Sequence, residues 1–101
     1  MKKPSQQYDP ESDFSIDWDE NAKDSVVIAK YIGSKQEVRI PPSIQNFPVT
    51  GIGDEAFVDN KNITSVTIPK GVTSIGFFAF WGCASLNCIT IPNIRKTARF
   101  T

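Results

Sequence analysis

The chain has 101 residues, which is enough for one small domain, and its 11 basic residues balance its 11 acidic residues. Without a basic excess, the sequence has no electrostatic footprint for binding nucleic acid. Histidine is absent, so the Ser–His and Cys–His pairs of nucleophilic catalysis are excluded. The hydrophobic content of 40% is typical of a folded protein rather than a disordered one.

Residues 1–12 are predicted to form a flexible tail. The segment up to Glu11 is polar and contains two prolines and two glutamines. Lys2 and Lys3 resemble the start of a signal peptide, but no apolar run follows them. Either the protein is not exported by that route, or a leader is missing from this sequence. No stretch approaches the length and hydrophobicity of a membrane span.

Residues 13–36 are predicted to form a β-hairpin that caps the rest of the chain. Phe14, Ile16 and Trp18 alternate with polar residues, which is the period of a strand with one buried face. Residues 25–31 are a second strand candidate, and polar residues between the two suit a turn. A cap is needed because the open end of a repeat array would leave core side chains in water.

Residues 37–92 contain a repeated sequence. The segment from Val49 to Pro69 recurs 23 residues later, from Val72 to Pro92, with nine identities in 21 positions. A period in the twenties is typical of stacked supersecondary units. Each unit has an alternating run that ends at an Ile-Pro pair, which predicts a short strand closed by proline. Residues 37–41 are an earlier strand of the same type, so we expect stacked coils with one continuous core.

The run from Ala79 to Pro92, AFWGCASLNCITIP, resembles the BspA-type leucine-rich repeat of bacteria, and so does VTSIG at Val72–Gly76. The resemblance covers roughly Val38 to Pro92. It implies a right-handed solenoid with a parallel sheet on one face. It also implies a cell-surface or secreted protein that acts in adhesion or host interaction.

The expected fold class is therefore a β-rich α/β solenoid. It would be a short right-handed leucine-rich-repeat array with a parallel sheet on one face, capped by the N-terminal β-hairpin. After Pro92 the repeat pattern fails, and residues 93–101 are basic and lack the expected glycine. We predict that this segment is a C-terminal tail rather than another coil. The apolar edge of the last coil is then covered either by this tail or by a second molecule.

Enzymatic chemistry has few candidate residues, and we expect no catalytic site, no metal site and no cofactor. The glycines are scattered singly and form no phosphate-binding loop. The acidic residues between Asp17 and Asp24 do not match a calcium loop, because Ala22 and Ile28 stand where glycine and glutamate are needed. We interpret this cluster as a solvated turn.

The two cysteines, Cys83 and Cys88, cannot complete a four-ligand zinc site by themselves. Cys83 matches the cysteine of the Gly-Cys pair in the family that the sequence resembles, and it is expected to be a small buried side chain. Cys88 aligns with Ser65 on the outward side of a strand. One inward and one outward side chain do not pair readily, so we predict two free thiols.

Two surfaces are candidates for binding a protein partner. The first is the outward face of the parallel sheet, formed by Glu37, Arg39, Ser65, Thr67, Cys88 and Thr90. The second is an aromatic patch, formed by Phe77, Phe78 and Trp81. These three align with Asp54, Glu55 and Val58 of the preceding unit. The alternatives are that the sheet face only keeps the protein soluble, and that the tail or a second molecule covers the aromatic residues.

The function that these observations favour is a non-catalytic protein-binding or adhesion module of bacterial surface type. It would hold a macromolecular partner, such as a host or matrix protein, through the sheet face or the aromatic patch. The alternative is a structural or self-associating unit, a homo-oligomer that pairs through its open C-terminal end. An enzyme is disfavoured because the usual catalytic pairs are missing.

Overall fold

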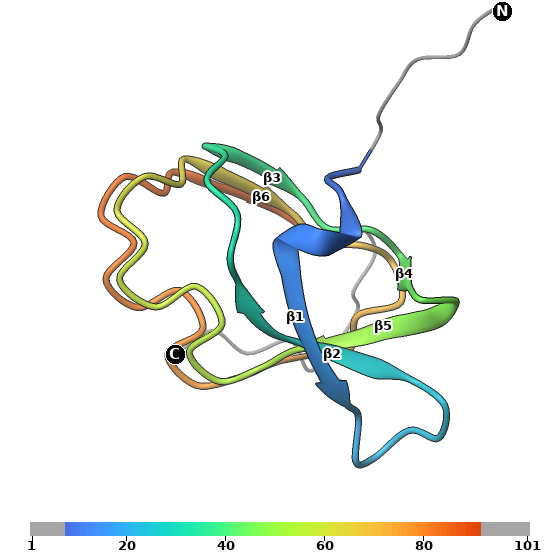
Figure 1. The fold of residues 1–101 in the computed structure, drawn as a ribbon. Coiled ribbons are helices and arrows are strands. Elements are labelled where there is room, and N and C mark those ends of the chain that lie inside the picture. Colours follow the sequence, from blue (N-terminus) through green and yellow to red (C-terminus); the bar gives the residue numbers. More distant parts are fainter. Residues whose placement is uncertain (1–7, 92–101) are drawn as a thin grey trace, which may run out of the picture.

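The computed structural model describes residues 8–91 (Figure 1). A 3-10 helix, η1 (Glu11–Asp13), comes before the strands. The strands follow in the order β1 (Phe14–Trp18), β2 (Val26–Tyr31), β3 (Glu37–Arg39), β4 (Ser43–Ile44), β5 (Phe47–Ile52), β6 (Ser65–Thr67), β7 (Ser74–Ile75) and β8 (Cys88–Thr90). We call residues 49–71 the first coil and residues 72–91 the second coil.

The described residues contain no α-helix, so this part of the chain is β-rich without the α component that the sequence predicts. The long connections between strands turn at residues with left-handed backbone. These are Glu55 and Asp59 in the first coil, and Phe78 and Gly82 in the second. A left-handed residue interrupts a right-handed helix, so neither connection can form more than a single turn of helix.

Three strands, β3, β6 and β8, lie side by side in a parallel sheet. Val38 pairs with Val66, and Val66 pairs with Ile89, so the repeated valine and isoleucine positions lie in one row. The side chains of Val38 and Val66 are buried, while their neighbours along each strand face away from the core.

A second set of parallel pairs joins β2, β5 and β7. Ile28 pairs with Ile52, and Ile52 pairs with Ile75. β1 lies antiparallel to β2 on the other edge, and β4 lies antiparallel to β5. The second strand of the N-terminal hairpin therefore takes the place of a repeat strand one coil before Ile52. Figure 1 shows the sheets curling around a common interior.

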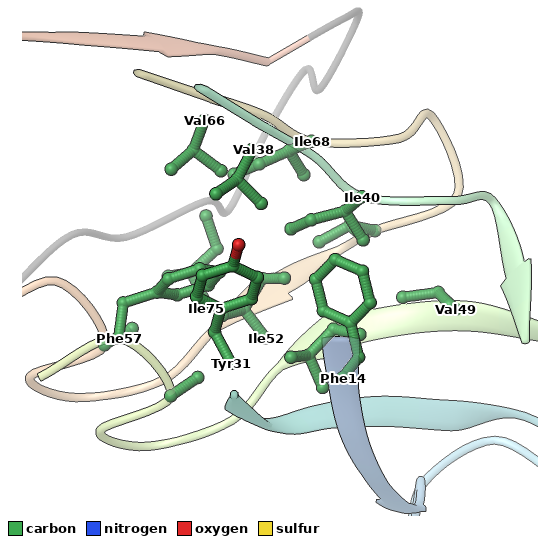
Figure 2. Close-up of a cluster of buried hydrophobic side chains, with 14 of the residues drawn as sticks. Phe14, Tyr31, Val38, Ile40, Val49, Ile52, Phe57, Val66, Ile68 and Ile75 are labelled. Carbon is green, nitrogen blue, oxygen red and sulfur yellow. The ribbon is translucent and has the colours of Figure 1, made fainter. Parts of the chain in front are cut away.

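The core is one continuous cluster of aliphatic side chains around a column of aromatic rings (Figure 2). Tyr31 stacks on Phe57 with ring centroids 5.4 Å apart, and Phe57 stacks on Phe80 at 5.0 Å. Phe14 packs against Tyr31 at the N-terminal end of the column. Phe57 is 2% exposed, whereas Phe80 is only partly buried. The Ala-Phe pair at both positions of the repeat predicts that the two phenylalanines are equally buried, and this prediction is wrong, because only Phe57 has a ring on both faces.

Residues 8–12 are attached to the edge of β3, although the sequence places them in a flexible tail. The amide of Asp9 donates to the carbonyl oxygen of Arg39 at 2.9 Å, and the amide of Arg39 donates to the Asp9 carboxylate at 3.1 Å. The amide of Gln45 donates to the Glu11 carboxylate at 3.0 Å. The two bonds to Arg39 satisfy backbone groups that the edge strand β3 would otherwise leave unpaired, and the third bond ties Glu11 to the turn between β4 and β5.

Residues 1–7 and 92–101 lie outside the described structure. The predicted C-terminal tail, residues 93–101, falls in this part, so its conformation and its covering role stay predictions. Within residues 8–91, no helix is long and apolar enough to cross a membrane.

Candidate functional site

The six predicted sheet-face residues lie together on one face. Parallel register aligns them in two rows, Glu37–Ser65–Cys88 and Arg39–Thr67–Thr90. All are exposed except Ser65, which is partly buried. This surface offers hydroxyl groups, one thiol and one charge of each sign. It can form hydrogen bonds with a partner, but it offers little apolar area to bury.

The aromatic patch lies in the turn that follows Gly76. Phe77 is 64% exposed, Phe78 49% and Trp81 58%. The rings of Phe78 and Trp81 meet edge to face with centroids 6.5 Å apart. The amide of Trp81 donates to the carbonyl oxygen of Phe78 at 3.1 Å, which closes the turn between them. Large aromatic side chains so exposed usually mark a contact surface.

Backbone hydrogen bonds tie this turn to the matching turn of the first coil. The amide of Glu55 donates to the carbonyl oxygen of Phe77 at 3.1 Å, and the amide of Asp59 donates to that of Trp81 at 2.7 Å. The amide of Phe77 donates to the Asp54 carboxylate at 2.9 Å. The two turns therefore run side by side, as the yellow and orange loops show in Figure 1.

Phe78 has a left-handed backbone, with φ of 59°. Its counterpart in the first coil, Glu55, has φ of 63°. This conformation costs a residue other than glycine about 1–2 kcal/mol, and a bulky side chain there is an outlier. The exposed ring of Phe78 gains little burial to offset that cost. An outlier of this kind is a reason to look for function at the position.

The second coil also carries no charged side chain: every residue from Gly71 to Asn93 is uncharged. The first coil contains Asp54, Glu55, Asp59, Lys61 and Lys70. Depletion of charge together with enrichment of aromatic residues is the compositional signature of an interface core. The uncharged run can be read directly from the sequence, although no single residue in it indicates a binding site.

An open apolar cavity of about 400 Å³ lies along the edge of the second coil. Its apolar lining includes Ile75, Ala79, Phe80, Ile89 and Ile91. The counterparts 23 residues earlier are all buried: Ile52, Ala56, Phe57, Val66 and Ile68. At this edge Phe80, Ile89 and Ile91 are only partly buried, whereas their counterparts in the first coil are fully buried.

Both cysteines are free thiols, as predicted. Cys83 is partly rather than fully buried, and its thiol donates to the carbonyl oxygen of Phe57 at 3.0 Å. Burial raises the pKa of the Cys83 thiol, which makes it a weak nucleophile. Cys88 is exposed on the sheet face. Within residues 8–91, no three His, Cys, Asp or Glu side chains are grouped to hold a metal ion.

The acidic turn of the N-terminal hairpin forms local hydrogen bonds. The Asp19 carboxylate accepts from the amide of Asn21 at 2.8 Å and from the hydroxyl of Thr50 at 2.6 Å. Asp19 thereby closes the hairpin turn and links it to β5. A structural role accounts for this carboxylate.

Several solved structures resemble the chain along most of its length. A leucine-rich repeat protein from T. pallidum is 29% identical with a TM-score of 0.80, over 85% of this chain and 40% of that one. A leucine-rich cell surface protein from Faecalibacterium prausnitzii is 31% identical with a TM-score of 0.73, over 91% of this chain and 25% of that one. A leucine-rich repeat protein from Bacteroides capillosus is 30% identical with a TM-score of 0.69, over 78% and 61%.

The chain therefore spans less than two thirds of the length of each of these proteins. A search among curated proteins found no match. A family model, the BspA type leucine-rich repeat region, matches residues 31–100 and so runs past Pro92, where the sequence predicts that the repeats end. Leucine-rich repeats generally act as scaffolds for protein interaction and generally lack enzymatic activity. Since the match covers more than half of its residues, the chain belongs to the BspA-type leucine-rich repeat family.

Proposed function

We propose that the chain is a non-catalytic protein-binding module of a bacterial surface protein, with an adhesion role toward a host or matrix protein. In this proposal the coils form part of a right-handed solenoid, and the N-terminal hairpin caps its first coil. Family membership supports a scaffold for protein interaction. The similarity to a leucine-rich cell surface protein supports a location at the cell surface.

The observation that carries the proposal is the aromatic patch on an uncharged coil. Phe77, Phe78 and Trp81 expose large rings that a partner can bury, and no charge on the second coil has to be desolvated with them. Aromatic residues are enriched at protein interfaces, and tryptophan is among the residues that most often dominate the binding energy. The sheet face has the weaker claim, because it is small and polar.

The test is solid-phase binding of the protein to purified fibronectin, laminin and collagen. We expect the double variant Phe77→Thr/Trp81→Thr to lose about tenfold or more in affinity for any protein that the wild type binds. The sheet-face variant Glu37→Thr/Arg39→Thr is the comparison and should stay within roughly twofold of wild type. Melting curves establish that both variants fold.

Loss of binding in the sheet-face variant alone would assign the role to the sheet face instead. Failure of the wild type to bind any of the three matrix proteins would contradict the adhesion role.

The second candidate function is self-association through the edge of the second coil. It is favoured by the apolar cavity beside Phe80, Ile89 and Ile91. Another copy of the chain that offered a similar edge would bury these side chains, at about 25 cal/mol per Å² of apolar surface. Sedimentation velocity tests this idea: a dimer that Ile89→Lys converts to a monomer would support it, and a monomeric wild type would contradict it.

A further inference from the structure

We propose that the aromatic patch, together with the carboxylates of Asp54 and Glu55, is a docking surface for a protein segment in which arginine stands beside apolar residues. This inference rests on the proposed protein-binding function and specifies the chemistry of the partner. It comes from the alignment of the two coils, which places an acidic row next to an aromatic one.

The two rows belong to equivalent positions on adjacent turns. Asp54 is the counterpart of Phe77, and Glu55 is the counterpart of Phe78. Glu55 and Phe78 share the same left-handed backbone, so their side chains leave neighbouring turns in similar directions. The turns are joined by the bond from the Glu55 amide to the Phe77 carbonyl oxygen. Adjacent hydrogen-bonded segments lie about 5 Å apart, so each carboxylate is within reach of a group stacked on the rings.

The charge of this surface is negative. Asp54 and Glu55 are both exposed, and neither forms an ion pair within residues 8–91. The remaining acidic residue of the turn, Asp59, is paired with Lys61 at 3.7 Å, so these two charges offset each other. The second coil has no charged residue of its own. An acidic partner segment would be repelled, and a basic one attracted.

Arginine fits this combination better than any other side chain. Its planar guanidinium stacks on the faces of tryptophan and phenylalanine rings, while its N–H groups bond to carboxylates. Bonds of this type between two charged groups are stronger than neutral ones. Apolar residues beside the arginine would cover the rest of the exposed rings. Trp81 and Phe77 thus provide the apolar contact, and Asp54 and Glu55 provide the preference for positive charge.

Fluorescence anisotropy with three labelled peptides tests the inference. The peptides share a leucine-containing framework and carry arginine, serine or glutamate at the variable positions. For the wild type, we expect the arginine peptide to bind about five- to tenfold more tightly than the serine peptide. Its affinity should fall as salt is added, whereas that of the serine peptide should change little.

The double variant Asp54→Asn/Glu55→Gln removes both charges and keeps the shape of the side chains. Asparagine can still accept the bond from the amide of Phe77 through its oxygen. We expect the preference for arginine over serine to fall to about twofold, which is the part that stacking on the rings supplies, with serine-peptide binding unchanged. The matched control, Glu11→Gln/Asp24→Asn, removes two exposed charges from η1 and the hairpin turn and should leave the preference intact.

The inference would be overturned by no binding of the arginine peptide, by equal binding of all three peptides, or by an arginine preference that the loss of both carboxylates leaves undiminished. The chain's own basic segment is tested as an alternative occupant with Arg95→Gln/Lys96→Gln/Arg99→Gln. Tighter binding of the arginine peptide by this variant would mean that the segment occupies the surface, which would contradict an external partner. Unchanged affinity would support an external partner.

Matrix binding by the Phe77→Thr/Trp81→Thr variant separates the charge preference of the patch from its role in binding. If the patch binds matrix proteins without any charge preference, the Phe77→Thr/Trp81→Thr variant still loses matrix binding, while the three peptides bind alike. If the proposed function is wrong, either the wild type binds none of the three matrix proteins or that variant keeps its matrix binding, whatever the peptides do.

Discussion

The first coil and the second coil share their turns but not their surfaces. Left-handed residues occur at equivalent positions, Glu55 with Phe78 and Asp59 with Gly82, although the residue types differ. Most identical positions of the repeat are those that pack or turn, such as the Ala-Phe pair and the Ile-Pro ending. The positions that differ most are exposed. The repeat therefore specifies a backbone, and its exposed positions are free to acquire a binding role.

The largest expected effect contrasts the two phenylalanines of the aromatic column. Phe57→Ala should lower the free energy of unfolding by about 3–5 kcal/mol, because Phe57 is buried between Tyr31 and Phe80. Phe80→Ala should cost about 1–2 kcal/mol, since Phe80 is only partly buried. Urea denaturation of both variants measures the difference. Equal losses would mean that the second coil is covered as fully as the first.

The next effect concerns the glycine that lets the two coils approach. A Cβ at Gly76 would collide with the Asp54 carboxylate and lie 2.6 Å from the Asp54 amide nitrogen, which is backbone and cannot move aside. Gly76→Ala should therefore cost about 1–3 kcal/mol. It should also weaken any binding at the aromatic patch, because the turn that carries Phe77 would shift.

The control for that variant is the equivalent position in the first coil. A Cβ at Gly53 would meet only one atom at close range, the carbonyl oxygen of Ile28 at 2.9 Å. Gly53→Ala should therefore be the milder of the two changes in the same denaturation assay. A Gly76→Ala variant as stable as wild type would show that the coils are not packed as closely as the structure has them.

A smaller effect is expected where the column begins with tyrosine instead of phenylalanine. The Tyr31 hydroxyl accepts a hydrogen bond from the amide of Lys35 at 3.0 Å. Tyr31→Phe should cost about 1 kcal/mol, which is the usual net value of one such bond. Thermal or urea unfolding at neutral pH measures it. A variant as stable as wild type would mean that water replaces the hydroxyl without loss.

The same residue predicts a dependence on pH. Burial raises the pKa of Tyr31 above its ordinary value of 10.0. The unfolded chain therefore loses this proton at lower pH than the folded chain does. The contribution of the protonated Tyr31 hydroxyl to stability is fully present below pH 10.0, and it is lost as the pH rises through the raised pKa of the folded state. In Tyr31→Phe this part of the alkaline loss of stability should disappear.

The sequence predicts the repeat strands well because identity at a 23-residue offset and alternation of apolar residues are local signals. It does not predict that β2 joins the ladder of β5 and β7, since Ile28 lies outside the repeated motif and pairs with Ile52 only through tertiary contact. The attachment of Asp9 to β3 is missed for the same reason. The partial burial of Phe80 could not be read from its motif, which is the same as that of Phe57.

The candidate surfaces were predictable to a different extent. Alternation along the strands is enough to place the sheet-face residues outward. The exposure of the aromatic patch follows from its alignment with Asp54 and Glu55, which are polar and lie on the outside. The strain at Phe78 could not be predicted from the sequence, because a positive φ is unusual for phenylalanine and no residue of the motif indicates one.

The smallest stability effect belongs to Phe78, and its sign is opposite to the others. Asparagine tolerates the left-handed conformation better than a bulky residue does, so Phe78→Asn should relieve about 1 kcal/mol of strain. Loss of the edge-to-face contact with Trp81 costs about 0.5 kcal/mol, so the net gain in stability is about 0.5 kcal/mol.

Gln45→Asn is the matched control, because Gln45 has φ of 55° in the turn between β4 and β5. Both variants should be slightly more stable than wild type in urea, but only Phe78→Asn should also weaken matrix-protein binding. A gain in stability with a loss of binding at Phe78 alone would mean that the strained ring is kept for the contact it makes. If Phe78→Asn were less stable than wild type and bound equally well, the ring would be a structural part of the second coil instead.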